Sequence, residues 1–501
     1  MSLLPPPHKP FIRRRERLSE RTAGTLDALL VLVPADADGA LFAQLPESAR
    51  WRALAGRARP VAATVRTSTL ANARQTRAVL GFVRKGASTF ETLALAGRML
   101  REIAPRELKR VGLVAPADKA GLGLEALLAA VLAHGFSLPS FRARSGAHAA
   151  LEHIELIGGK TLDLERIQAV SRANNLCRWL TALPPNKLDA RGYRASIARL
   201  ARSHRLRMRW LNESALKRLG ANAFLAVSAG NAERTAGIAH LRYRPRRRRG
   251  AAPQVTLIGK GILFDTGGTN LKPHRAMLDM HTDMAGSAVA LAALIALAEL
   301  QAPIAVDAWL AITANRIGPS SYVPQEVVRA ANGVTIQVIH TDAEGRMVLA
   351  DTLALASRTR PRFMIDFATL TGACVHALTE RMSGVFCNQP RLLEALLAAG
   401  RASGERVWGF PFDADYDSDL ESKTADIMQC APEGKGDHIL ATRFLSRFVP
   451  EQQAWAHVDL ASAMRSGGLA HINSDITGFG VRYVLELLLG HHIDATLAPR
   501  A

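Results

Sequence analysis

The stretch "LIGKGILFDTGGTNLKPHRAMLDMHTDMAGSA", residues 257–288, joins a short apolar run to a group of charged residues. Lys260 and Asp265 flank the apolar piece, and Gly267 and Gly268 then permit a tight backbone turn. In open α/β sheets, ligands gather where strands end in polar side chains. The stretch therefore predicts a strand of an α/β sheet with a functional site at its carboxyl end.

Apolar segments of strand length recur around this stretch, with helical patterns between most of them. We predict strands at residues 224–230, 236–245, 253–261, 304–313, 361–369 and 454–462. Residues 26–150 show a similar rhythm, with strands predicted at 26–34 and 111–116 and helices at 91–104 and 124–135. That rhythm indicates a second, smaller and mostly parallel sheet.

The two series are separated by a helix predicted over residues 163–183 and by "PPNKLD" (184–189), where two prolines break the pattern. We predict an α/β protein of two domains. A smaller N-terminal α/β domain covers residues 1–170, and a larger C-terminal α/β domain with a central mixed sheet flanked by helices covers residues 171–501.

Composition agrees with a globular protein, because 501 residues that are 48% hydrophobic and only 5% aromatic favour helix-rich α/β packing. The apolar run 284–298 is shorter than the roughly 20 residues that cross a bilayer, so we expect a buried core helix and no membrane association. The first residues lack the apolar core of a secretory signal, which makes the cytoplasm the expected location. The four cysteines lack metal or disulfide spacing and are expected to be packing residues: Cys177, Cys374, Cys387 and Cys430.

Charge is unevenly distributed along the chain. Residues 1–250 hold 44 Lys and Arg against 18 Asp and Glu, whereas residues 251–501 hold 20 against 26. Arginine runs at 11–20, 203–210 and 242–250 carry much of the excess. Such a surface could attract nucleic acid or another polyanion, but the runs carry no recognised nucleic-acid motif, and a solvated Arg-rich surface is the simpler interpretation.

A second stretch, "HTDAEGRMVLAD" (340–351), places Asp342, Glu344 and Arg346 at alternating positions before an apolar run. If the stretch is extended, both carboxylates point to the same side and can share an ion. Asp279 and Asp283, four apart at what resembles a helix start, add to the acidic set. Carboxylates packed together repel one another unless cations neutralise them. The residues alone leave open whether those cations are two divalent metals or the nearby lysines and arginine.

Several motifs in order closely resemble those of the leucyl aminopeptidase family, the dimetal enzymes of the cytosolic leucine aminopeptidase and aminopeptidase A type. They are "GKGILFDTGGTNLKP", "DMHTDMAGSA", "HTDAEGRMVLAD", "DFATLTGA", "DYDSDLESKTADI", "WAHVDLASAM" and "TGFGVR". The resemblance covers roughly residues 170–485, and residues 1–170 match only in general α/β character. It implies that the C-terminal domain is catalytic and that the protein is a metalloexopeptidase.

The resemblance implies two divalent metal ions, Zn²⁺ or Mn²⁺ with Mg²⁺ as a third candidate. One ion would be held by Lys260, Asp265, Asp283 and Glu344, and the other by Asp265, Asp342 and Glu344. A lysine ligand must bind as the neutral amine, which a neighbouring dication favours.

For catalysis, the resemblance implies that the metals polarise a water molecule, that Lys272 polarises the peptide carbonyl, and that Arg346 holds a bicarbonate acting as general base. The side chain of the first substrate residue, Leu or Met by preference, would lie in a pocket formed by Met280, Thr369, Gly372, Ala461 and Met464. The family also implies a homohexamer acting on peptides.

Two histidines depart from the family pattern, since His340 stands where Asn is usual and His281 where Lys is usual. Neither position supplies a metal ligand in the family, so we expect them to adjust substrate preference or the metal surroundings. Other histidines are expected to be structural or exposed, including His274, His438 and His457. The alternative function is that of a nucleic-acid-binding protein on an aminopeptidase scaffold, using the basic N-terminal half.

Overall fold

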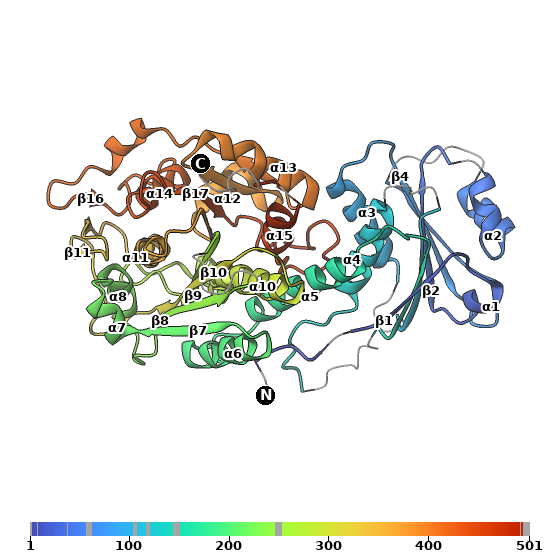
Figure 1. The fold of residues 1–501 in the computed structure, drawn as a ribbon, viewed down its shortest axis with the longest axis horizontal. Coiled ribbons are helices and arrows are strands. Elements are labelled where there is room, and N and C mark those ends of the chain that lie inside the picture. The colour runs from blue at the N-terminus through green and yellow to red at the C-terminus, as the bar shows by residue number, and fades with distance from the viewer. Residues whose placement is uncertain are drawn as a thin grey trace.

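The computed structural model describes residues 3–7, 9–37, 39–56, 63–103, 108–116, 121–143, 151–245, 253–490 and 492–493. Within these ranges the chain forms two α/β units, a smaller N-terminal one and a larger C-terminal one, joined near helix α5 (Figure 1). This arrangement confirms the predicted fold class.

The N-terminal unit contains a six-stranded sheet in the order β1-β6-β5-β2-β4-β3, in which only β3 runs antiparallel to its neighbour. Its strands are β1 (Phe11–Arg15), β2 (Ala28–Pro34), β3 (Val65–Thr69), β4 (Arg77–Val83), β5 (Arg110–Val114) and β6 (His153–Ile157). Its helices are α1 (Glu20–Ala23), α2 (Ser48–Ala55), α3 (Thr89–Arg101) and α4 (Leu122–His134). The strands and helices predicted between residues 26 and 135 are thus confirmed.

The C-terminal unit is built on an eight-stranded mixed sheet in the order β15-β14-β17-β13-β9-β10-β8-β7. Its strands are β7 (Arg207–Asn212), β8 (Gly237–Tyr243), β9 (Val255–Asp265), β10 (Val306–Asn315), β13 (Phe363–Ala368), β14 (Ser383–Cys387), β15 (Val407–Gly409) and β17 (Ala454–Asp459). Strand β9 lies near the centre and is parallel to both neighbours, β13 and β10. The opening stretch of sequence therefore supplies a central strand.

Residues 224–230 are not the strand that we predicted. They fall mainly in helix α8 (Asn222–Ser228), which packs against helix α11 (Glu344–Ser357). Short apolar runs fit a buried helix as well as a strand, and tertiary contacts decide between them. Here the buried carboxylate of Asp351 on α11 accepts a hydrogen bond from the Phe224 N–H at 2.8 Å, which fixes the start of the helix.

Helices cover both faces of the large sheet. One apolar cluster includes side chains from α5 (Leu164–Thr181), α6 (Ala190–Ser203), α10 (Ala285–Glu299), α13 (Leu393–Ser403) and α15 (Val481–Leu489). The other includes side chains from α7 (Glu213–Arg218), α8, α11 and α14 (Asp437–Ser446). Helices α9 (His274–Met277) and α12 (Gly372–Leu378) and a small sheet of β11 (Val327–Arg329), β12 (Thr335–Gln337) and β16 (Ile427–Met428) lie nearer the site.

Helix α10 is the buried core helix expected from residues 284–298. The helical stretch His274–Glu299 is apolar and long enough to cross a membrane, but 89% of its most apolar window is buried inside the protein. Close contact with the sheet depends on glycine, because a Cβ atom at Gly286 would lie 2.0 Å from the Phe367 carbonyl oxygen. The start of α10 is therefore held directly against the sheet.

Helix α5 packs against both units, contacting α4 on one side and α10 on the other. Its buried Arg178 donates hydrogen bonds to Asn175 at 2.8 Å and to Ser474 at 2.9 Å. The boundary between residues 170 and 171 falls inside this helix and stays a prediction. All four cysteines are buried and free, in agreement with a packing role.

A pH-dependent contribution to stability is expected from His204, which follows α6. Its Nε2 lies 3.2 Å from Glu299 Oε1 at the end of α10, and this hydrogen bond raises the pKa of His204. A raised histidine pKa stabilises the fold below the unfolded value of about 6.5 and is lost as pH rises through the folded value. His204→Gln should therefore cost on the order of 1 kcal/mol at about pH 5.5 and little at about pH 9.

Urea unfolding at both pH values measures this difference, with exposed His274→Gln on α9 as the matched control. An equal cost for His204→Gln at the two pH values would contradict the expectation.

Candidate active site

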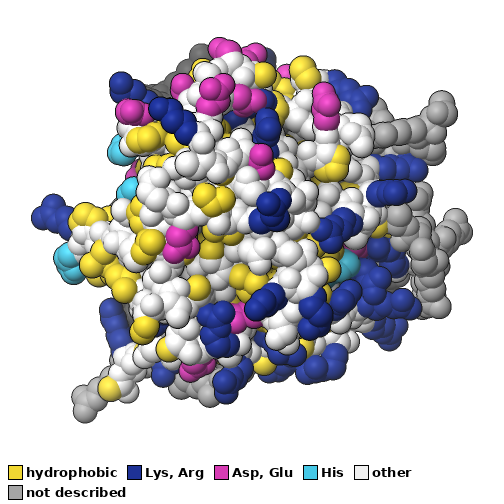
Figure 2. All heavy atoms as spheres, turned by 90° about the vertical axis from the view of Figure 1, so that its left-hand side faces the viewer, with side chains coloured by type: hydrophobic (Ala, Val, Ile, Leu, Met, Phe, Trp, Pro, Cys, Tyr) yellow, Lys and Arg dark blue, Asp and Glu magenta, His cyan; other side chains and the backbone are white. Residues whose placement is uncertain are grey.

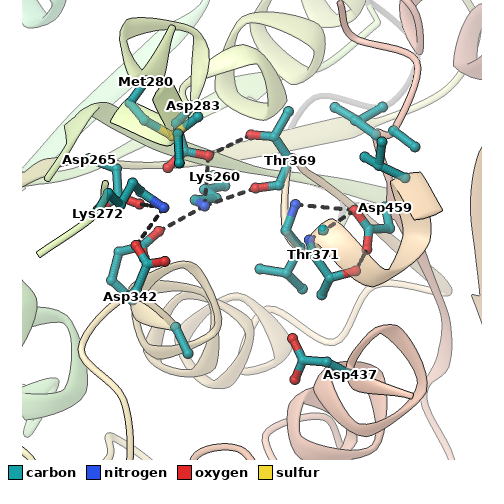
Figure 3. A pocket seen from close by; sticks show the side chains of 18 of the residues that line it. Lys260, Asp265, Lys272, Met280, Asp283, Asp342, Thr369, Thr371, Asp437 and Asp459 are labelled. Atoms are coloured by element: carbon teal, nitrogen blue, oxygen red, sulfur yellow. Dashed lines mark hydrogen bonds and ion pairs between the residues drawn. The ribbon is translucent and has the colours of Figure 1, made fainter. Parts of the chain in front are cut away.

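The site begins on β9, where Lys260 lies in the middle of the strand and Asp265 ends it, and both side chains are buried. Lys260 Nζ lies 2.8 Å from Asp283 Oδ1 and 2.8 Å from Glu344 Oε1, and it donates a hydrogen bond to the Thr369 carbonyl at 2.9 Å. Figure 3 shows this lysine in the middle of the group. A central strand thus brings together residues that are far apart in sequence.

A second lysine closes the other side of the group. Lys272 Nζ lies 3.0 Å from Asp265 Oδ2 and 2.5 Å from Asp342 Oδ1 (Figure 3). Asp265 Oδ1 accepts hydrogen bonds from the Gly267 N–H and from Asn315 Nδ2, each at 2.8 Å. The Asp265 carboxylate is therefore fixed in orientation by the turn that follows β9 and by the end of β10.

The "HTDAEGRMVLAD" stretch is not extended, in contrast to the geometry that we considered. Asp342 lies in a turn, and Glu344 is the first residue of helix α11. The two carboxylates nevertheless converge, because oxygens of Asp265, Asp342 and Glu344 all lie within 4.8 Å of one another. An acidic residue in the first helical turn also interacts favourably with the helix dipole.

Asp279 and Asp283 flank the short 3-10 helix Met280–Thr282 and do not share one helical face. Asp283 accepts a hydrogen bond from Thr369 Oγ1 at 2.7 Å and faces Lys260, as Figure 3 shows. Asp279 is outside these ion pairs, although it lines the same cavity. The structure therefore brings together four of the five acids in the set.

The charges of this group do not balance within the chain. Four carboxylates (Asp265, Asp283, Asp342 and Glu344) face two ammonium groups (Lys260 and Lys272), which leaves two negative charges. Burial and the nearby Asp265 raise the pKa of Glu344 well above its usual value.

Two buried oxygens, Asp283 Oδ2 and Glu344 Oε2, also have no hydrogen-bond partner among the described residues. Uncompensated charge and unpaired oxygens together fit divalent cations, which prefer such donors.

The group lies in a cavity of about 930 Å³. All seven expected metal-binding and catalytic residues line it, and so do all five expected substrate-binding residues: Lys260, Asp265, Lys272, Asp283, Asp342, Glu344, Arg346, Met280, Thr369, Gly372, Ala461 and Met464. A Cβ atom at Gly372 would meet no described heavy atom within 4 Å, so this glycine opens space in the cavity.

Comparisons with known proteins agree with this geometry. Residues 175–485 match the model of the cytosol aminopeptidase family, catalytic domain. A probable cytosol aminopeptidase of Synechococcus sp. (strain CC9605) is 39% identical over 344 residues, which cover 68% of this chain and 69% of that protein. This chain belongs to the cytosol aminopeptidase family. It is accordingly a metallopeptidase of the leucyl aminopeptidase type, and the resemblance seen in the sequence is confirmed.

Solved structures of the family are similar over nearly the whole chain. The bottromycin maturation enzyme BotP, solved in complex with Mn, has a TM-score of 0.81 and 29% identity, covering 93% of this chain and 100% of that one. A tomato leucine aminopeptidase variant has a TM-score of 0.86 and 24% identity, covering 97% and 98%, and shows the fold alone. The likeness therefore extends to the N-terminal unit, where sequence resemblance is weak.

The histidines that depart from the family pattern occupy different places. His340 lines the cavity, and its Nδ1 lies 3.2 Å from the Asp342 N–H. His281 is half-buried on the 3-10 helix and is not among the described residues that line the cavity. His340 is thus the departure that can affect substrate or metal surroundings directly.

The remaining histidines follow expectation. His457 is fully buried with its Nδ1 2.6 Å from Asp366 Oδ1, and His438 packs edge-on against Phe410 with ring centroids 4.4 Å apart. His274 is exposed at the start of α9.

Arg346 is placed differently from a free anion-binding residue. Its side chain is 2% exposed, and its Nη2 donates hydrogen bonds to both carboxylate oxygens of Asp437, at 2.8 and 2.7 Å. Its Nη1 donates to the Gln429 carbonyl at 3.2 Å. A carboxylate of the chain therefore already binds one amino group of this guanidinium.

Sequence reasoning missed Asn315 and Asp437. Asn315 ends β10 directly beside Asp265 at the end of β9, so the rule of polar residues at strand ends could have found it. Asp437 follows a loop with glycines at 434 and 436 and starts α14, far along the chain from Arg346. No pattern in the sequence links it to the cavity.

Proposed function

We propose that this protein is a metal-dependent aminopeptidase that removes N-terminal residues, preferably Leu-like, from peptides by means of a water molecule activated by two metal ions. The excess of two carboxylates over ammonium groups in the lysine and carboxylate group is the observation that carries the proposal. A structural ion-pair network would be expected to balance its charges.

Two sets of ligands are proposed. One ion would be held by Lys260, Asp265, Asp283 and Glu344, and the other by Asp265, Asp342 and Glu344. Zn²⁺ or Mn²⁺ are the preferred ions, with Mg²⁺ as a third candidate. When bound, such ions lower the pKa of water and polarise a carbonyl. Lys260 would act as a ligand in its neutral form.

Lys272 is proposed to bind the substrate carbonyl. Its ammonium lies between Asp265 and Asp342, so the side chain already reaches the middle of the group. Once cations neutralise those carboxylates, the ammonium can donate to the oxygen on which negative charge develops. Arg346 is proposed to hold the group that accepts the proton from water, for which the family resemblance suggests bicarbonate.

The first side chain of the substrate is proposed to lie against Met280, Thr369, Gly372, Ala461 and Met464, which line the cavity. Two methionines adapt their shape to different apolar groups, and Gly372 leaves open space. These features suit an unbranched or γ-branched apolar side chain such as Met or Leu.

The proposed setting is a cytoplasmic homohexamer that acts on peptides. The alternative, nucleic-acid binding, rests on the arginines of the first half of the chain. The arginines of 203–210 belong to the large unit. Together with the arginines of α6 they form a series of exposed side chains along α6 and β7: Arg191, Arg194, Arg199, Arg202, Arg205, Arg207 and Arg209. Figure 2 shows Lys and Arg gathered on the lower part of one face. The run at 246–249 lies outside the described residues.

Binding of this kind would weaken steeply as salt rises, because phosphate contacts release counterions. A flat salt response of DNA or RNA retention would contradict the alternative.

Chelation tests the proposed function. Purified protein treated with a chelator and dialysed should lose hydrolysis of Leu-p-nitroanilide, and Zn²⁺ or Mn²⁺ should restore it. Ca²⁺ serves as the control ion, because it prefers about six to eight oxygen ligands and the proposed sets are smaller and include the Lys260 nitrogen. A chelated protein that keeps its full rate would contradict the proposal.

A further inference from the structure

Asp437, the carboxylate bound by Arg346, lines the same cavity as the proposed metal ligands. We propose that Asp437 supplies, from the chain itself, the carboxylate that accepts the proton of the attacking water, so that hydrolysis needs no bicarbonate. This inference rests on the function proposed above and assigns one further catalytic residue to it.

Peptide hydrolysis needs a group that takes a proton from water and returns it to the leaving nitrogen. In the proposed site, Asp265, Asp283, Asp342 and Glu344 are occupied as metal ligands. Further carboxylates line the cavity, and two of them, Asp437 and Asp459, form hydrogen bonds that show how each is oriented.

Asp459 is a poor candidate among them, because it is 1% exposed and already accepts hydrogen bonds from the Thr371 hydroxyl at 2.6 Å and from the Leu370 N–H at 3.1 Å. These contacts hold the loop after β13, as Figure 3 shows. Both of its carboxylate oxygens are therefore engaged by that loop.

Asp437 has the opposite environment. Its side chain is 24% exposed and lines the cavity, while the arginine that holds it is only 2% exposed. Figure 3 shows its carboxylate extending from α14 toward the open space. A buried guanidinium stays protonated, so it fixes the carboxylate without competing for the proton.

The position of Arg346 ties this carboxylate to the metal ligands. Arg346 lies two residues after Glu344 in the first turns of α11, and Gln429 restrains it from the other side. Arg346 and Glu344 both line the cavity, so an anion held by Arg346 shares this cavity with a proposed bridging ligand. Asp437 occupies the anion position at Arg346 Nη2, whereas the buried Nε of Arg346 has no hydrogen-bond partner among the described residues.

A water oxygen forms a bond to the peptide carbonyl carbon while one water proton passes to the Asp437 carboxylate. The C–N bond then breaks, and the protonated Asp437 returns the proton to the leaving nitrogen. Asp437 ends the cycle as a carboxylate, and no further reactant is consumed.

Chemical rescue tests the proposal in the metal-loaded protein. In buffer freed of carbon dioxide, wild type should keep its full rate of Leu-p-nitroanilide hydrolysis, and Asp437→Ala should lose about 10²- to 10⁴-fold in kcat with little change in KM. Formate or bicarbonate should raise the rate of Asp437→Ala at least about tenfold, because the anion fills the space next to Arg346.

The chain offers a matched control in a second arginine–aspartate pair, which joins α14 to the 3-10 helix Ala414–Leu420. Asp417 accepts two hydrogen bonds from Arg443 of α14, at 2.7 and 2.6 Å, with its side chain 34% exposed. Asp417→Ala removes an equivalent pair outside the residues that line the cavity. It should keep its kcat and show no response to formate.

Two readouts are independent of rate. Asp437→Ala should retain two metal ions per subunit, and formate should raise its Tm but not that of wild type, because only the variant has an open anion position.

Stimulation of wild type by bicarbonate would overturn the proposal, and so would an Asp437→Ala variant whose rate without any added anion is within threefold of wild type. A loss of rate that formate does not rescue would also overturn it. Wild type that is inactive with every metal would instead overturn the proposed function, and this inference with it.

Discussion

Glu344→Gln is expected to lower kcat/KM for Leu-p-nitroanilide by on the order of 10³-fold or more. The substitution keeps the shape of the side chain, which is 1% exposed, but removes one negative charge from the proposed bridging ligand. Loss of a bridging carboxylate should reduce metal content, and metal-derived charge stabilisation is worth several kcal/mol. Activity and metal content by mass spectrometry measure the two effects on one sample.

The variant should remain folded, because Lys260 keeps its ion pair with Asp283 at 2.8 Å. Glu451→Gln is the matched control, since Glu451 is exposed and lies outside the cavity-lining residues. A Glu344→Gln protein that holds two metals and keeps activity within tenfold of wild type would show that Glu344 is not a metal ligand.

Gly286→Ala is expected to lower the free energy of unfolding by about 3 kcal/mol, as overpacking does in a tight core. The added Cβ would lie 2.0 Å from the Phe367 carbonyl oxygen and 3.1 Å from the backbone nitrogen of Lys260. Both partners are backbone atoms of the sheet, so the helix itself must move away. Urea unfolding of the two proteins measures the change.

Because Asp283 lies three residues before Gly286, movement of α10 should also displace a proposed ligand and reduce metal affinity. Gly24→Ala is the control. Gly24 has a φ of −65°, and the nearest atom to an added Cβ is 3.5 Å away, so its effect should stay within about 0.5 kcal/mol. Equal stability of wild type and Gly286→Ala would contradict the packing described for α10.

Much of the fold could be predicted from apolar runs, because β9 and α10 are mostly apolar and therefore indicate buried elements, although β9 also carries Lys260 and Asp265. The exception, residues 224–230, shows the limit of that reasoning. Its short apolar run fits two structures, and a hydrogen bond from a distant residue, Asp351, decides between them. Local pattern does not contain that information.

The residues of the candidate site also differ in how well the sequence predicts them. Residues carried by contiguous motifs, such as Lys260 and Asp265, could be predicted because the motifs resemble a known family. The side chains that orient them could be predicted less well. Asn315 reaches Asp265 through strand register, and Asp437 reaches Arg346 across 91 residues of chain. Pairings at that separation arise only when the sheet and its helices are assembled.

Helix α5 has a consequence for how this molecule comes apart. Its residues pack against α4 of the small unit and against α10 of the large one, and Arg178 bonds to Ser474 near the end of the chain. If α5 leaves either unit, apolar surface of both units becomes exposed to water. The stabilities of the two units are therefore coupled. The protein should therefore melt in a single transition, and a protease that nicks the polypeptide between the two sheets should leave its pieces associated.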